Sequence, residues 1–148
     1  MSAIGKVAMY GECVETQLKR ILVVDDFAAW RLFLKTLLTV TPEWQVIEEA
    51  ISGAEALTKA KELKPDLVLL DLDLPDANGI DIARQLHTLA PNARIVFLTA
   101  ESSSEIANAA LGTGALGYLL KSQVVDELLP ALKSVFSDNR FVSKGITL

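Results

Sequence analysis

Three carboxylates, one hydroxyl and one ammonium each stand at the end of a short apolar run of the chain. These five residues are Asp25, Asp26, Asp71, Thr99 and Lys121. A single Asp or Thr at such a position is usually a solvated loop residue, but five residues at equivalent positions favour one shared site. If the runs are parallel strands, their carboxyl ends meet at one edge of the sheet, where ligands bind. The sequence therefore predicts that these side chains converge.

Converging carboxylates repel one another, by about 4 kcal/mol for each close pair at an effective dielectric constant of about 20. A divalent cation relieves this repulsion, and carboxylate oxygens suit Mg²⁺, which keeps several waters and also binds phosphate. The lysine would pair with an anion held by the metal, and the threonine hydroxyl would donate to that anion. Because the pattern has no His, Cys or Ser with a base beside it, the expected nucleophile is a carboxylate. An aspartate that attacks phosphorus forms an aspartyl-phosphate, and neutralising charge on the transferred group is then the main catalytic task.

Five apolar runs predict the strands that position these residues: Arg20–Asp25, Gln45–Glu48, Asp66–Asp71, Arg94–Leu98 and Leu116–Leu120. The first, third and fourth runs are almost continuously apolar, which is typical of parallel strands covered by helices on both faces. Segments with helical spacing lie between the runs. The alternation indicates five βα units and a doubly wound α/β domain.

Residues that begin or break helices refine this alternation. Ser52 with Glu55, and Ser102 with Glu105, have the spacing of capping boxes and predict the starts of two helices. Pro130 lies inside the last apolar helical stripe, so we expect it to kink that helix or to delay its start.

The chain has 148 residues, a length that favours one compact domain. We expect that domain at residues 20–139. Residues 1–19 show no clear periodicity and are predicted to form a loose N-terminal extension. Residues 140–148 are too short to be a domain and are interpreted as a short C-terminal tail or a truncated linker.

The composition excludes several classes of protein. Apolar residues make up 51% and charged residues 22% of the chain, which disfavours a disordered or low-complexity protein. The formal charge of −5 argues against a chain that itself binds nucleic acid. There is no apolar run of about 18 residues that would span a membrane, and the first residues lack a signal-peptide pattern. A single cysteine, Cys13, excludes an internal disulfide. We therefore expect a soluble cytoplasmic domain.

Four stretches of the chain resemble the receiver domain of two-component response regulators, from Arg20 to about Asn139. The stretches are Ile21–Asp26, Leu69–Gly79, Leu98–Ala100 and Gly117–Lys121. Together and in this order they are highly specific. The resemblance implies a flavodoxin-like fold, in which a doubly wound five-stranded parallel sheet of order 2-1-3-4-5 is covered by five helices.

The resemblance also implies roles for the acidic residues. Asp71 would be the phosphoacceptor and a metal ligand. Asp26 would bind Mg²⁺ directly, Asp25 largely through water, and the backbone carbonyl of Asp73 would be a further ligand. The side chain of Asp73 adds a negative charge near the phosphoryl group.

Further roles fall on the fourth and fifth strands. Thr99 would bond a phosphoryl oxygen, Lys121 would pair with the phosphoryl group, and the small Ala100 would leave room for it. Tyr118 would be an aromatic switch that turns inward when Thr99 moves toward the phosphate. Taken alone, Tyr118 is also compatible with an ordinary strand residue whose hydroxyl meets water.

The phosphoryl group is expected to come from a sensor histidine kinase, because the only histidine, His87, is interpreted as a helix-surface residue. The chain would catalyse only its own phosphorylation and dephosphorylation, and in that sense it is not an enzyme. A surface of the fourth helix, fifth strand and fifth helix would then bind a partner, a second copy of the chain among the candidates.

Many receivers have proline directly after the lysine, whereas this chain has Ser122. With the run Gly117–Lys121, this variant resembles the LuxR/FixJ branch, whose output is a helix-turn-helix domain that binds DNA. Such an output domain is absent from this chain, which is either a stand-alone receiver or a receiver cut from a longer regulator.

Two other functions fit parts of the pattern. Asp71 and Asp73 resemble the opening motif of haloacid-dehalogenase-type phosphatases, although that family places its further acidic pair late in the chain, whereas Asp25 and Asp26 come early here. The chain also fits a receiver-like interaction module that works without phosphorylation. The phosphatase would turn over a phosphomonoester, and the interaction module would bind no phosphoryl mimic.

Overall fold

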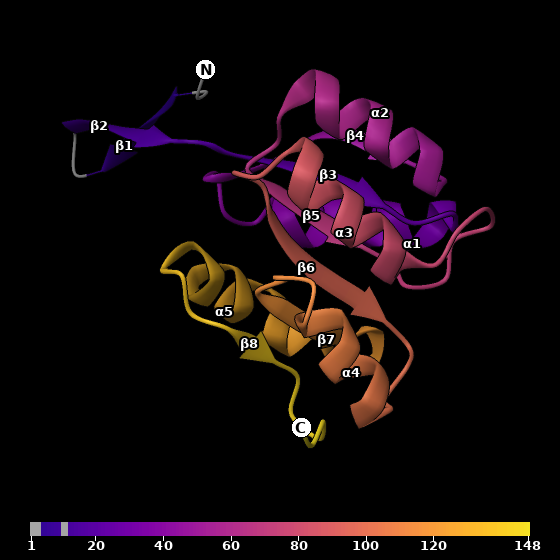
Figure 1. Ribbon diagram of the computed structural model, residues 1–148. Helices are drawn as coiled ribbons and strands as arrows, with labels where there is room; N and C mark the ends of the chain where they lie inside the picture. The colour runs from indigo at the N-terminus through magenta and orange to yellow at the C-terminus, as the bar shows by residue number, and fades with distance from the viewer. Residues whose placement is uncertain (1–3, 10–11) are drawn as a thin grey trace.

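The computed structural model describes residues 4–9 and 12–148, with side chains from residue 17 onward (Figure 1). Its main sheet contains six parallel strands in the order β4-β3-β5-β6-β7-β8. These strands are β3 (Lys19–Val24), β4 (Trp44–Ala50), β5 (Leu67–Leu70), β6 (Arg94–Thr99), β7 (Gly117–Leu120) and β8 (Phe141–Val142). The helices are α1 (Ala28–Leu38), α2 (Gly53–Leu63), α3 (Gly79–Leu89), α4 (Ser104–Leu111), the 3-10 turn η1 (Lys121–Gln123) and α5 (Val124–Phe136).

Two apolar cores lie on opposite faces of this sheet. Successive strand residues point to opposite faces, so Leu22 and Val24 enter one core while Ile21 and Val23 enter the other. Helices α2, α3 and α4 cover the first face, and α1 and α5 cover the second. Because both faces are buried, the central strands are apolar throughout, as the sequence predicted.

The predicted order of five strands is confirmed, but the strand count is wrong by one. Strands β4, β3, β5, β6 and β7 follow the expected order 2-1-3-4-5, and β8 adds a sixth strand beside β7. This strand lies in residues 140–148, which were interpreted as a tail or linker. A strand of two residues has no period that a sequence pattern can reveal.

Residues Ile4–Met9 and Glu12–Gln17 form strands β1 and β2, which pair with each other in a separate antiparallel sheet. This hairpin projects from the body of the molecule (Figure 1). The loose extension predicted for residues 1–19 is therefore corrected to a hairpin where it is described. Residues 1–3 and 10–11 of that extension lie outside the described residues.

One predicted helix cap needs correction. The hydroxyl of Ser52 accepts a hydrogen bond from the Glu55 amide at 3.1 Å, as expected, but Ser103 rather than Ser102 caps α4. Helix α5 starts at Val124 and contains Pro130, an exposed residue, so the proline does not delay the start of the helix. Within the described part of the chain, no helix has both the length and the apolar character needed to cross a membrane.

Candidate functional site

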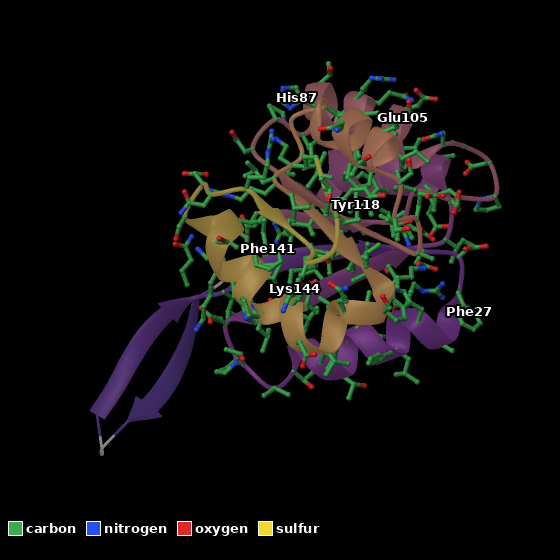
Figure 2. All side chains as sticks on the ribbon, turned by 90° about the horizontal axis from the view of Figure 1, so that it is seen from below. Phe27, His87, Glu105, Tyr118, Phe141 and Lys144 are labelled. Atoms are coloured by element: carbon green, nitrogen blue, oxygen red, sulfur yellow. The ribbon has the colours of Figure 1, made fainter. Side chains whose placement is uncertain are left out.

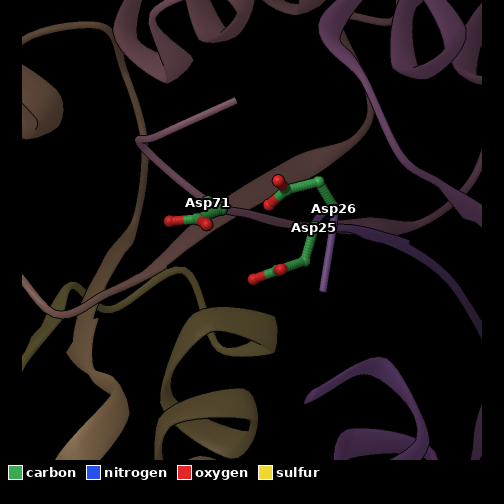
Figure 3. A group of neighbouring side chains, drawn as sticks. All are labelled: Asp25, Asp26 and Asp71. Carbon is green, nitrogen blue, oxygen red and sulfur yellow. The ribbon is translucent and has the colours of Figure 1, made fainter. Parts of the chain in front are cut away.

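Three carboxylates meet where strands β3 and β5 end. Asp25 and Asp26 follow β3, Asp71 follows β5, and each offers an oxygen atom within 4.8 Å of the others (Figure 3). They meet because β3 and β5 are neighbours in register, with Val24 beside Leu70. Asp25 and Asp71 are buried and Asp26 is exposed. The cluster therefore presents one solvent-facing and two sheltered carboxylates.

The loop after Asp71 is held against its own strand. Gly79 packs on the backbone so closely that a Cβ atom there would lie 2.7 Å from the Leu72 Cα and would clash with the Asp71 carbonyl. The amide of Asp73 donates to Asp71 Oδ1 at 3.4 Å. The Asp76 carboxylate accepts from the two backbone amides that begin α2, at 2.7 and 3.0 Å. These contacts place the backbone amide of Asp73 beside the carboxylate of Asp71, while the residue itself is exposed.

Lys121 reaches this cluster from the end of β7. Its Nζ donates to Asp25 Oδ2 at 2.7 Å and to Asp71 Oδ2 at 3.3 Å, and it lies 5.1 Å from the centroid of the Trp30 ring. Burial lowers the pKa of Lys121, but the hydrogen bond to Asp25 and the charge of Asp71 outweigh it, so the pKa is raised. Lys121 is therefore a persistent cation between two buried carboxylates.

The electrostatics of Asp71 are dominated by its burial. Burial raises the pKa of Asp71, the positive charge of Lys121 lowers it, and the negative charge of Asp25 raises it, with a net value of about 6. A carboxylate with a raised pKa is more basic than an ordinary aspartate. Asp71 consequently carries an unfavourable charge at neutral pH, which a bound cation would relieve.

Thr99 and Tyr118 are linked through the backbone of Glu101. Thr99 is buried at the end of β6, and its hydroxyl accepts from the Glu101 amide at 3.1 Å. Tyr118 is fully buried in β7, and its hydroxyl donates to the Glu101 carbonyl at 2.7 Å. Burial, with the charges of Glu101 and Asp73, raises the pKa of Tyr118 to about 12. Tyr118 therefore points inward in this structure. Ala100, which lies between Thr99 and Glu101 in the chain, is exposed.

The structure brings Asp25, Asp26, Asp71 and Lys121 together as expected, and it places Thr99 on the intervening strand β6. His87 is exposed on α3, in agreement with its predicted surface position.

Sequence reasoning missed several contacts that shape this site. The Arg31 guanidinium donates to the Asp25 carbonyl at 2.7 Å, and the Phe27 amide donates to Asp25 Oδ1 at 2.8 Å. The role of Glu101 was also missed. A hydroxyl residue two positions before an amide is a known local pattern, which offered a signal for the bond between Thr99 and Glu101.

Comparison with known proteins identifies the family. The family model described as the response regulator receiver domain matches residues 21–133. The chain belongs to this receiver family. It is 35% identical over 127 residues to the response regulator GacA of Pseudomonas viridiflava, covering 86% of this chain and 59% of that protein. It is 37% identical over 117 residues to the chemotaxis protein CheY of Thermotoga maritima, covering 79% of this chain and 97% of CheY. This receiver thus matches nearly all of CheY but spans about three fifths of GacA.

Solved structures agree with this assignment. A two-component response regulator of the LuxR family from Aurantimonas sp. SI85-9A1 has a TM-score of 0.83 and 33% identity, covering 87% of this receiver and 92% of that chain. The response regulator domain of CheB from Thermotoga maritima has a TM-score of 0.75 and 31% identity. The match covers 81% of this receiver and 97% of the CheB chain. The receiver therefore has the flavodoxin-like α/β fold, and its relatives include the LuxR-type branch that its sequence resembles.

Proposed function

We propose that this receiver domain accepts a phosphoryl group on Asp71 from a phosphohistidine of a sensor histidine kinase. The observation that carries this proposal is the position of Asp71, a buried carboxylate held 3.3 Å from Lys121 within an acidic cluster. The raised pKa makes the Asp71 carboxylate more basic than an ordinary aspartate, and greater basicity favours its action as a nucleophile. A structural role alone would not require three carboxylates at one strand edge.

The residues of the cluster fit a divalent cation. Three carboxylates and one ammonium leave a formal charge of −2, and oxygen ligands of this kind suit Mg²⁺. Asp26, Asp71 and the carbonyl of Asp73 would hold the ion, with Asp25 acting largely through water. When bound, Mg²⁺ supplies positive charge that neutralises the oxygens of the transferred group.

The transfer requires only one bond exchange. A carboxylate oxygen of Asp71 attacks phosphorus, the P–O bond forms and the P–N bond to the kinase imidazole breaks. The imidazole leaves with the electron pair of that bond and takes up a proton from water. Lys121 would turn toward the phosphoryl oxygens, Thr99 would donate to one of them, and Ala100 would leave room for them.

The transferred group would bias a two-state element. Thr99 and Tyr118 both hold the backbone of Glu101, so a Thr99 hydroxyl that turns toward a phosphoryl oxygen changes a loop that Tyr118 also holds. The expected output surface comprises α4, β7 and α5, with a second copy as a candidate partner.

The relatives support a transcriptional output for this surface. The transcriptional regulatory protein LnrK of Bacillus subtilis is 35% identical, and the chain spans 58% of its length. We infer that this receiver controls a transcriptional output domain that lies outside the chain.

The test is the intact mass after incubation with Mg²⁺ and acetyl phosphate, a small phosphodonor. The wild type should gain one phosphoryl group, in an acid-stable and base-labile linkage, and Asp71→Asn should gain none. Asp81→Asn, an exposed aspartate on α3, is the matched control and should behave as the wild type.

The alternative functions give different results. An interaction module that works without phosphorylation would show no mass gain and no Mg²⁺-dependent binding of beryllofluoride. A phosphatase would show steady turnover of a phosphomonoester. A gain in Asp71→Asn would mean that another residue is the acceptor.

A further inference from the structure

Residues Phe141–Ile146 form a strap along the edge of β7, which would otherwise be the open edge of the sheet. Backbone amides of the strap donate to the carbonyls of Leu116 and Tyr118, at 2.8 and 2.9 Å. The hydroxyl of Ser143 accepts from the Leu120 amide at 2.8 Å, so a side chain continues the ladder where β8 ends. The strap thus satisfies backbone groups of β7 that an unpaired edge would leave free.

A carboxylate on α5 fixes the strap in place. Glu127 accepts from the hydroxyl of Ser143 through one oxygen and from the amide of Lys144 through the other, the latter at 3.0 Å. Ser143 is 2% exposed, so its hydroxyl bridges β7 and α5 in a buried position. We refer to Ser143 and Glu127 together as the clamp.

Apolar side chains of the strap enter the cores on both faces of the sheet. Val142 and Ile146 pack against the core that contains Tyr118 and the buried residues of α4, whereas Phe141 packs against the core beneath α5. Gly145, with a φ of +95°, turns the chain so that Ile146 returns to the body of the molecule. Figure 2 shows Phe141 and Lys144 on the same side of the molecule as Tyr118. The strap therefore lies along β7 and against α5, and its apolar side chains enter the cores on both faces of the sheet.

The strap contacts the two residues of β7 that lead to the candidate site. The Ser143 amide binds the carbonyl of Tyr118, and the Ser143 hydroxyl binds the amide of Leu120, which directly precedes Lys121. Lys121 in turn holds the carboxylates of Asp25 and Asp71. The strap and the candidate site therefore share one short stretch of backbone, from Tyr118 to Lys121.

We propose that the strap is a releasable cover of the edge of β7 and the adjoining side of α5, and that an occupied Asp71 site weakens its docking. This inference rests on the proposed function, because a phosphoryl group at Asp71 is the trigger. Thermodynamic linkage makes the coupling reciprocal: the factor by which an occupied site weakens docking of the strap is the factor by which a docked strap weakens binding at the site. The strap competes with any external partner for this surface.

The first measurement tests release without any ligand, by hydrogen–deuterium exchange of the full chain. Amides of the strap should exchange faster than those of β5 and β6, because the strap can detach without global unfolding of the domain. Glu127→Gln weakens the clamp and should raise exchange of the strap about tenfold while leaving the central strands unchanged. Asp126→Asn makes the same charge change one residue away and should have no effect. Strap amides that exchange only together with the central strands would overturn the proposal.

The second measurement adds Mg²⁺ and beryllofluoride, with binding followed through the fluorescence of Trp30 beside Lys121. Trp30→Phe identifies this signal. Beryllofluoride should speed exchange of the strap several-fold, and Glu127→Gln should bind beryllofluoride several-fold more tightly than the wild type or Asp126→Asn. Binding that leaves the exchange of the strap unchanged would overturn the coupling. A protein that binds no beryllofluoride would contradict the proposed function, and the first measurement would still decide whether the strap is releasable.

Discussion

Two borders of the main sheet differ in how their polar groups are paired. One is the acidic edge, at the carboxyl ends of β3 and β5, and the other is the side of β7. Where β3 and β5 end, three carboxylates crowd around one ammonium, and two of these carboxylates are buried. Along β7, the strap pairs the backbone of the edge strand, and the clamp uses both oxygens of Glu127. The first edge retains charge repulsion, whereas the second satisfies its polar groups.

This contrast indicates where the molecule can respond to a ligand. A cluster with unrelieved repulsion gains free energy from a cation or from loss of a charge, so its state depends on what it binds. A fully paired edge gains nothing from a ligand and can only be opened. The two edges are joined through Leu120 and Lys121, which are consecutive in the chain.

The largest effect should come from removing the Lys121 ammonium from the acidic edge. Lys121→Ala leaves Asp25 and Asp71 buried without their partner, and we expect a loss of about 3 kcal/mol in the free energy of unfolding at pH 7.5 without Mg²⁺. Urea denaturation measures this loss. At pH 4 the loss should shrink, because Asp71, whose pKa is raised to about 6, is then protonated. An equal loss at both pH values would contradict the electrostatic interpretation.

Asp71→Asn should raise the free energy of unfolding at pH 7.5, whereas Lys121→Ala lowers it. The pKa of Asp71 is raised from 3.8 to about 6, so the unfolded chain releases this proton before the folded chain does. Stability of the wild type therefore falls as pH rises from about 4 to about 6, and stays reduced above that range. Without Mg²⁺, we expect Asp71→Asn to be more stable by up to about 3 kcal/mol at pH 7.5 and nearly equal at pH 4.

Denaturation with urea in EDTA at both pH values checks this expectation. Asp126→Asn, an exposed acid on α5, is the control and should show no such pH dependence. A variant less stable than the wild type at pH 7.5 would mean that the hydrogen bonds of Asp71 outweigh its desolvation.

The acidic edge was predictable from the sequence because its chemistry is tied to strand ends. Asp25, Asp71, Thr99 and Lys121 each follow an apolar run, and the parallel arrangement of those runs fixes where their ends meet. The order and direction of the strands are enough to predict that the carboxylates lie together, without knowing how the helices pack.

The second edge was not predictable in this way. Ser143 and Glu127 lie 16 residues apart on different elements, and only the packing of α5 against β7 brings them together. The hairpin of β1 and β2 was missed because residues 4–17 show neither of the expected periodicities. Contacts of this kind depend on tertiary placement rather than on local pattern.

A smaller effect should follow from opening the second edge. Ser143→Ala removes the acceptor of the Leu120 amide and one donor to Glu127, and we expect a loss of about 2 kcal/mol. Unlike the effect of Lys121→Ala, this loss does not depend on the charge of Asp71, so protonation of Asp71 at pH 4 should not reduce it. Ser137→Ala, at an exposed serine that follows α5, is the matched control and should change little. Thermal denaturation of the three proteins provides the measurement.

The smallest effect should be at Asp26, the exposed member of the acidic edge. Without Mg²⁺, Asp26→Asn relieves repulsion near the surface and should raise stability by less than about 1 kcal/mol. With Mg²⁺ in excess, the wild type should become the more stable protein, because it binds the ion more tightly and is stabilised by that binding. Melting curves in EDTA and in Mg²⁺ measure the difference in stability between Asp26→Asn and the wild type under each condition. Asp126→Asn is the control and should respond to the ion as the wild type does. A variant that is less stable under both conditions would show that Asp26 supports the fold rather than a cation, because only a ligand role reverses the sign.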